Sequence, residues 1–124
     1  MTSVLECIEA GTRYLEKRQV DDARRNMQLM VAHVLGCSRM ELYVQFDRPL
    51  SEAELAPLRE ALRLRGERVP LQHILGEVEF HRRSFRCDAR ALIPRPETEE
   101  LVELLLRRCM PIPGQVLDLS LIHI

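Results

Sequence analysis

Three Ser-x-x-Glu tetrapeptides punctuate the first half of the chain, and they constrain its fold more than any other feature. They begin at Ser3, Ser38 and Ser51. In such a capping box the serine side chain accepts a free amide proton of the first helical turn, and the glutamate side chain reaches back to the serine amide. Apolar residues at helical spacing follow each tetrapeptide. The sequence therefore predicts that a helix begins immediately after each of these serines.

A further helix is predicted between the first two capping boxes. It is expected to begin at Asp21 or Asp22 and to end at Gly36, because glycine readily adopts the left-handed conformation of a helix C-cap. The helix that follows Ser38 is short, and we expect it to continue to about Phe46.

These four helices share one pattern, since each has a single apolar stripe and a charged opposite face. None is long enough to be stable alone in water. The chain has three Phe, two Tyr and no Trp, so a shared core must be aliphatic. The fourth helix is expected to run toward Gly66. We therefore predict a small helical bundle over residues 1–68, and a chain that is mainly α-helical.

The pattern changes after the fourth helix, where Pro70 prevents the helix from continuing. Residues 77–80 and 84–87 alternate polar and apolar side chains, as strands do, and residues 81–83 lie between them. We predict a β-hairpin linker over residues 69–92. Its apolar face is expected to carry Val78, Phe80, Phe85 and Cys87.

A fifth helix and a strand are predicted in the last third of the chain. Pro96 suits the first turn of a helix, where its missing amide proton costs nothing, and acidic residues follow it at the positive helix end. Residues 115–119 indicate a short buried strand with an acid, Asp118. A helix followed by such a strand commonly opens a doubly wound α/β domain. We therefore predict that residues 93–119 are the first helix and strand of a Rossmann-like domain.

Composition excludes several classes of protein. A net charge of −1 gives no general attraction to nucleic acid or to an anionic membrane. No signal peptide and no membrane-length apolar run is visible. The four cysteines are too widely spaced for a zinc knuckle or a dense disulfide framework. We therefore expect a protein of the reducing cytoplasm.

Two segments of the second half are distinctive. They are Pro70-Leu71-Gln72-His73-Ile74-Leu75-Gly76, which continues to Phe80, and Leu92-Ile93-Pro94-Arg95-Pro96-Glu97-Thr98-Glu99. These segments, and the order of helical domain, hairpin and Val-Leu-Asp-Leu strand, resemble the release factor glutamine methyltransferase family. The resemblance covers nearly the whole chain and is strongest from Pro70 to Leu119.

The resemblance implies a specific activity in translation termination. Members of this family bind S-adenosylmethionine in a Rossmann-like domain. They methylate the side-chain amide nitrogen of the glutamine in the Gly-Gly-Gln loop of class I peptide chain release factors. The resemblance also implies that residues 1–68 recognise the release factor. We expect a monomer that binds neither nucleic acid nor a membrane directly.

The resemblance implies three cofactor-binding residues, namely Arg95, Thr98 and Asp118. Each also has a purely structural interpretation, which stays open at this point. Thr98 would lie in the first turn of a helix, Arg95 would hold the preceding loop, and Asp118 would be an ordinary carboxylate at the end of a strand. His73 and His81 have no partner at metal-binding spacing, so we expect no metal site.

Two motifs that the family uses for catalysis do not occur. The resemblance calls for Gly-x-Gly-x-Gly after Leu119 and for an Asn-Pro-Pro-Tyr loop, but residues 120–124 read Ser-Leu-Ile-His-Ile. We therefore expect a truncated N-terminal part without a catalytic residue, which is inactive alone. Residues 119–124 match one reading frame of a sequencing adapter. We hypothesise that 120–124 form a non-native tail.

Other functions remain possible at this stage. A sister group of the family methylates a ribosomal protein by the same chemistry. A stand-alone helical protein-binding module would have the same first 68 residues. An amino-methyltransferase of nucleic acid is less well supported, because the chain has no basic excess. Arg82, Arg83, Arg86 and Arg90 form a basic stretch that we interpret as a solvated hairpin face, with contact to a release factor or RNA as the alternative.

Overall fold

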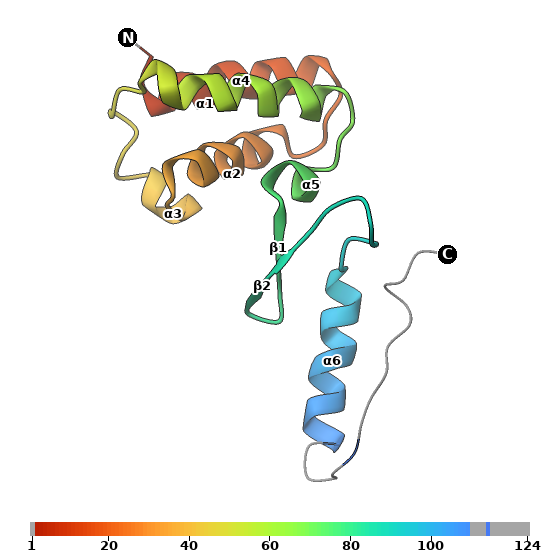
Figure 1. Cartoon of the computed structure of the whole chain (residues 1–124). Helices are drawn as coiled ribbons and strands as arrows, with labels where there is room; N and C mark the ends of the chain where they lie inside the picture. Colours follow the sequence, from red (N-terminus) through yellow and green to blue (C-terminus); the bar gives the residue numbers. More distant parts are fainter. Residues whose placement is uncertain (1, 110–113, 115–124) are drawn as a thin grey trace. The chain divides into compact units, whose positions relative to one another are not determined.

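The computed structural model describes residues 2–109 and 114, and the chain divides into two compact units, Met1–Ile74 and Leu75–Ile124. Most of the described chain is helical, and a two-stranded antiparallel hairpin follows, as the sequence predicts (Figure 1). The elements are α1 (Val4–Lys17), α2 (Ala23–Leu35), α3 (Arg39–Leu42), α4 (Glu52–Gly66), α5 (Leu71–Leu75), β1 (Glu77–Phe80), β2 (Arg83–Arg86) and α6 (Pro96–Cys109).

Serine caps begin three of the helices, which confirms the prediction from the tetrapeptides. The Ser38 and Ser51 side chains accept the amide protons of Glu41 and Glu54 at 3.2 and 3.3 Å. Each of these glutamates also accepts the amide proton of its serine, so both boxes are complete. Ser3 makes only the first of the two bonds, to the Glu6 amide. Each cap satisfies an amide that the helix itself cannot pair.

The helix α3 ends earlier than the sequence predicts, at Leu42 rather than near Phe46. The Tyr43 amide donates to the Met40 carbonyl, and the Gln45 amide donates to the Leu42 carbonyl. Each bond joins residues three positions apart, so the chain continues as tighter 3₁₀-type turns. Val44 is 86% exposed. Because Tyr43 and Val44 are exposed, little burial holds this stretch in a regular helix, and the apolar residues beyond α3 do not extend it.

The helix α5 was not predicted from the sequence. The Pro70 carbonyl accepts the amide protons of His73 and Ile74 at 3.0 and 3.2 Å, and α5 therefore begins directly after the proline. A proline ends a helix that arrives from its N-terminal side, but it suits the start of the next one. The same residue that indicated a linker was also the signal for a new helix.

The core of the first unit is aliphatic, as predicted. In Figure 1, α1 and α4 run side by side, and α2 contacts both. Gly11 lies where α1 meets α2, and the Met27 side chain occupies the space that a Cβ on Gly11 would need. Met27 is itself 1% exposed. The largest fully buried side chains are those of Ile8, Leu15, Met27, Met30, Leu42, Val4 and Val31.

A polar link joins the start of α2 to the end of α4. Arg65 Nε donates to Asn26 Oδ1 at 2.8 Å, and Asn26 is only 8% exposed. The Asn26 amide group donates in turn to the carbonyls of Asp21 and Asp22. Asp22 itself is left-handed, with φ of 51°, and its side chain does not cap α2. A buried amide that is fully hydrogen-bonded in this way fixes the approach of the two helices.

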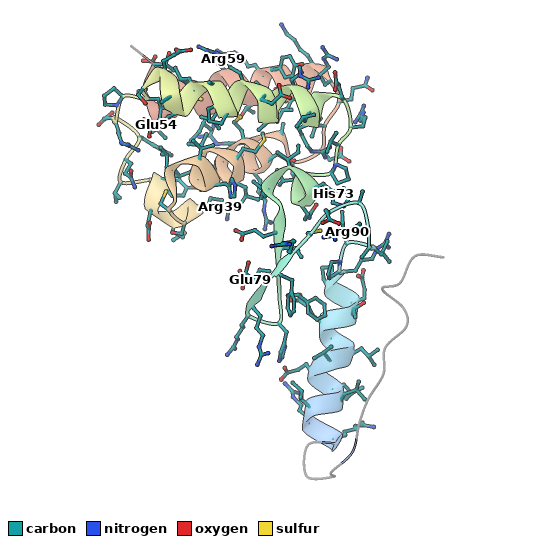
Figure 2. All side chains as sticks on the ribbon, in the orientation of Figure 1. Arg39, Glu54, Arg59, His73, Glu79 and Arg90 are labelled. Carbon is teal, nitrogen blue, oxygen red and sulfur yellow. The ribbon has the colours of Figure 1, made fainter. Side chains whose placement is uncertain are left out.

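The outward side of α4 carries ion pairs. Arg63 bonds Glu60 at 2.6 Å and Glu67 at 2.9 Å, and Arg59, which Figure 2 labels, is paired with Glu52. These groups are exposed, so each pair adds little to stability. They give α4 the charged face that its sequence predicts.

The second unit begins with the predicted hairpin. In its register Val78 faces Phe85 and Phe80 faces Arg83, which places the apolar residues on one face, as expected. The turn contains two residues, His81 and Arg82, rather than three, because Arg83 pairs in the ladder. Among residues 2–109, no helix is long and apolar enough to cross a membrane.

The helix α6 follows the hairpin and has the expected acidic first turn and basic last turn. Its leucines remain partly exposed, with Leu101 at 54% and Leu106 at 38%. The predicted strand at 115–119, Asp118 and the tail at 120–124 lie outside the described residues. The Rossmann-like part of the fold therefore stays a prediction.

Candidate functional site

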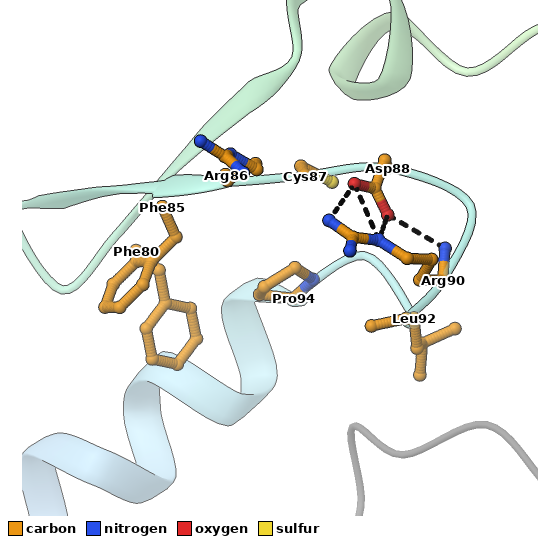
Figure 3. A pocket seen from close by; sticks show the side chains of 9 residues that line it. Phe80, Phe85, Arg86, Cys87, Asp88, Arg90, Leu92 and Pro94 are labelled. Carbon is orange, nitrogen blue, oxygen red and sulfur yellow. Dashed lines mark hydrogen bonds and ion pairs between the residues drawn. The ribbon is translucent and has the colours of Figure 1, made fainter.

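A cavity of about 480 Å³ opens in the second unit, between the hairpin and the loop that precedes α6 (Figure 3). Its lining is mostly apolar, with one charged pair beside it. The lining residues are Phe80, Phe85, Arg86, Cys87, Asp88, Arg90, Ala91, Leu92 and Pro94. Concave apolar sites with a few polar groups are the usual form of a small-ligand site, so this cavity is the candidate site of the unit.

Two phenylalanines form the hairpin wall of the cavity. The rings of Phe80 and Phe85 are 6.3 Å apart between centroids and 75° between planes, which is an edge-to-face arrangement. They come from different strands, and the antiparallel register brings them to the same face. Phe85 remains 46% exposed. The wall therefore offers a partly exposed apolar surface to a side chain or ligand.

Asp88 and Arg90 form a charged pair in the lining, which also includes Arg86. Asp88 Oδ2 accepts from Arg90 Nη2 at 2.7 Å, and Oδ1 accepts from the Arg90 backbone amide at 3.0 Å (Figure 3). Hydrogen bonds from the Arg90 side chain and amide lower the pKa of Asp88 to about 2. This carboxylate is therefore ionised at neutral pH, and the pair braces the loop.

Cys87 lies between the hairpin and this loop and is 6% exposed. Its amide donates to the Gly76 carbonyl at 3.0 Å, which extends the pairing beyond β2. Burial raises the pKa of the Cys87 thiol, and the Asp88 charge adds to the effect. The thiol is therefore neutral at pH 7 and acts as an apolar lining group rather than a nucleophile.

Arg95 and Thr98, two of the residues named from the sequence, lie at the start of α6. The Arg95 carbonyl accepts the amide protons of Thr98 at 3.0 Å and Glu99 at 3.3 Å, so its backbone begins the helix. The Arg95 side chain is exposed and forms no ion pair with another residue of 2–109, while Thr98 is half-buried. The third named residue, Asp118, lies outside the described part of the chain.

A second, more open cleft separates the hairpin turn from α6. Glu99 Oε1 accepts the His81 amide proton at 2.7 Å, and Glu103 Oε2 lies 3.9 Å from His81 Nδ1. From the sequence, Glu99 was predicted only to favour the positive end of the helix. Its bond to a residue 18 positions away has no local sequence signal. Within the described residues, no group of three metal-binding side chains comes together.

The first unit can be compared with known families. Residues 6–76 match the model of the PrmC N-terminal domain, which is more than half of the chain. The chain belongs to the PrmC family. The match covers the bundle from α1 to α5, and thus the part in which the sequence resemblance was weakest.

Other PrmC-family proteins are similar over a longer stretch. Release factor glutamine methyltransferases of Geobacter sulfurreducens and Chlorobaculum tepidum are 42% and 39% identical, each over 86% of this chain. A human protein named MTRF1L release factor glutamine methyltransferase is 39% identical over 108 residues. The chain spans about a third of the length of these relatives, 37%, 36% and 32%.

These alignments extend beyond the family model. An alignment of 106 residues is longer than the segment 6–76, so it includes parts of the chain outside the PrmC N-terminal domain. The likeness to release factor glutamine methyltransferases is therefore not confined to the bundle.

Proposed function

We propose that the protein containing this chain transfers a methyl group from S-adenosylmethionine to the side-chain amide nitrogen of the Gly-Gly-Gln glutamine in class I peptide chain release factors. The observation that carries the proposal is the match of residues 6–76 to the PrmC N-terminal domain. The names of the relatives support the same activity. In this proposal the protein acts as a cytoplasmic monomer.

The two units have different tasks in the proposal. Residues 1–68 recognise the release factor, residues 69–92 link the domains, and residues 93–119 begin a Rossmann-like catalytic domain. A glutamine amide is a poor nucleophile, because its nitrogen lone pair is delocalised into the carbonyl. The chief contribution of the protein is therefore to hold that nitrogen in line with the donor methyl group. S-adenosylmethionine supplies this methyl group from a sulfonium centre.

Arg95, Thr98 and Asp118 are the residues that we assign to the cofactor side of the site. The exposed Arg95 guanidinium has no carboxylate partner among the described residues and fits the carboxylate of the cofactor's methionine moiety. Thr98 offers a hydroxyl one helical turn away. Gly-x-Gly-x-Gly and Asn-Pro-Pro-Tyr are absent from the 124 residues. We therefore expect no methyl transfer from the chain alone.

Binding and catalysis can be tested separately. The 124-residue chain should bind a purified class I release factor in isothermal titration calorimetry. The complete protein should methylate that release factor, and mass spectrometry of the loop peptide should locate the methyl group on the glutamine. A release factor with this glutamine replaced by asparagine is the control. Methylation of a ribosomal protein instead would support the sister activity, and binding without any methylation would support a stand-alone binding module.

The role of Arg95 has its own control. In the complete protein, Arg95→Ala should raise the KM for S-adenosylmethionine while the melting temperature changes little. Arg108, an exposed arginine in the last turn of α6, serves as the matched control. Equal effects of Arg95→Ala and Arg108→Ala, or a loss of activity that merely follows a loss of stability, would contradict the assignment.

A further inference from the structure

The hairpin turn has an unusual sequence for its shape. His81 and Arg82 both have positive φ, 49° and 63°, and Phe80 pairs directly with Arg83. A two-residue turn with both residues left-handed is normally made by Asn-Gly or similar pairs, because a Cβ is unfavourable there. Histidine occurs at positive φ more often than most residues, but arginine has no such preference. The turn must therefore be held by something other than its own preferences.

Glu99 is the residue that holds it. Its Oε1 accepts the His81 amide proton at 2.7 Å, within the range of charge-assisted hydrogen bonds. Glu99 is half-buried and lies in the first turn of α6, where the helix dipole favours a carboxylate. Its own backbone amide donates to the Arg95 carbonyl at 3.3 Å. One residue thus connects the turn at His81 to the segment that begins α6.

We propose that Glu99 is a positioning residue: it locks the strained hairpin turn onto α6 and so sets the Phe80–Phe85 wall of the cavity relative to Arg95 and Thr98. The wall depends on the turn because the turn fixes the register in which β1 pairs with β2. A slip of one residue would move each strand's side chains to the opposite face. Phe80 directly precedes the turn, so it is the first residue that such a slip would displace.

Glu103 contributes less to the lock. It lies one helical turn beyond Glu99, and its carboxylate is 3.9 Å from His81 Nδ1. That distance is too long for a hydrogen bond, and Glu103 also accepts from Arg107 Nε at 3.3 Å. The lock therefore depends on Glu99, and Glu103 only adds negative charge beside the imidazole.

The structural part of the proposal is tested on the 124-residue chain by amide hydrogen exchange and NMR. Glu99→Ala should lower the protection of the His81 and Arg83 amides at least about tenfold, because the bond to a charged acceptor is lost. Glu99→Gln keeps an acceptor oxygen and should retain most of the protection. Glu100→Ala removes a neighbouring exposed carboxylate of the same cleft and is the control.

A rescue variant separates the lock from a general loss of folding. Asn-Gly adopts this turn without help, so His81→Asn with Arg82→Gly should restore the Arg83 protection in the Glu99→Ala background. If Glu99→Ala and Glu100→Ala give the same protection, or if Asn-Gly does not rescue, the lock does not exist. None of these measurements requires methyl transfer.

The functional part rests on the proposed methyltransferase activity. In the complete protein, Glu99→Ala should lower kcat for the release factor about tenfold and leave the KM for S-adenosylmethionine nearly unchanged. The Asn-Gly pair and Glu99→Gln should each restore kcat. If kcat is unaffected while the exchange result holds, Glu99 is only structural and the positioning role is wrong. If the wild-type protein does not methylate, the proposed function fails and the lock still stands on the exchange data.

Discussion

The contact between Gly11 and Met27 gives the sharpest prediction for the stability of the bundle. A Cβ added at Gly11 would lie 2.3 Å from Met27 Sδ and 2.8 Å from its Cγ. A methionine side chain is flexible, and Met27 borders a cavity of about 370 Å³, but its Cγ would have to shift together with the tip of the side chain. Gly11→Ala therefore overpacks the interface between α1 and α2.

The expected size of the effect combines two opposing contributions. Overpacking a core costs about 1–3 kcal/mol. Replacing glycine by alanine inside a helix contributes about 1 kcal/mol in the other direction. Gly11→Ala should therefore lower the free energy of unfolding by about 1 kcal/mol, from roughly zero to 2 kcal/mol. Urea denaturation followed by far-ultraviolet circular dichroism measures this difference.

Gly66→Ala is the matched control, because this helical glycine is also close to a side chain. Its added Cβ would meet Tyr14 ring atoms at 3.0–3.4 Å. Tyr14 is half-buried and can move outward, so the change should lie within about 0.5 kcal/mol of the wild type. A Gly11→Ala protein that is more stable than the wild type would contradict the packing argument.

A double-mutant cycle makes the test stricter. Met27→Ala alone should cost about 2–5 kcal/mol, because it leaves a cavity. In that background Gly11→Ala meets no side chain and should stabilise the helix by about 1 kcal/mol. The two effects should therefore be coupled by about 2 kcal/mol. Additive effects would mean that Gly11 and Met27 do not meet as the structure has them.

Three further predictions concern polar contacts. The Asp88 carboxylate should titrate near pH 2 by NMR instead of near its ordinary 3.8, and Arg90→Gln should return it toward that value. Since the folded pKa is lowered, the stabilisation is complete above the unfolded value and is lost as the pH falls through about 2. Arg65→Ala should destabilise the chain by about 1–3 kcal/mol in urea denaturation, because buried Asn26 loses a partner. Ser51→Ala should cost about 1 kcal/mol in the same assay, because the capping box is lost. Ser51→Gly should cost only a few tenths of a kcal/mol, because glycine is itself a favourable N-cap residue. A Ser51→Ala effect within error of zero would rule out a role for this cap.

The sequence predicted those parts of the fold that local chemistry determines. The caps at Ser38 and Ser51 and the C-cap at Gly36 each need only residues within one helical turn, and all three are present. The hairpin faces followed from strict alternation, which the register confirms. The prediction was wrong at the early end of α3, where the exposure of the following residues decides, and it missed α5, for which Pro70 was a local signal.

The candidate site could be predicted from the sequence less well than the fold could. The resemblance pointed to the segment around Arg95 and Thr98, and the cavity does lie beside the loop that leads to it. Its lining comes from the hairpin and from residues 87–94. Phe80, Leu92 and Pro94 belong to the segments that carry the family resemblance, but the residues between Phe85 and Ala91 carry no motif. The Asp88–Arg90 pair had a signal that was overlooked, because aspartate often bonds the amide two residues on.

The acidic first turn of α6 shows how a correct local explanation can hide a longer-range one. Helix-dipole reasoning accounts equally well for Glu97, Glu99 and Glu100, and it makes them interchangeable. The hairpin removes this equivalence, because only Glu99 accepts the amide proton of a left-handed turn residue. That turn has an unfavourable sequence, and a favourable one would not need the carboxylate. The unusual left-handed conformation at His81 and Arg82 is therefore explained by Glu99, which lies 18 positions from His81 in the sequence.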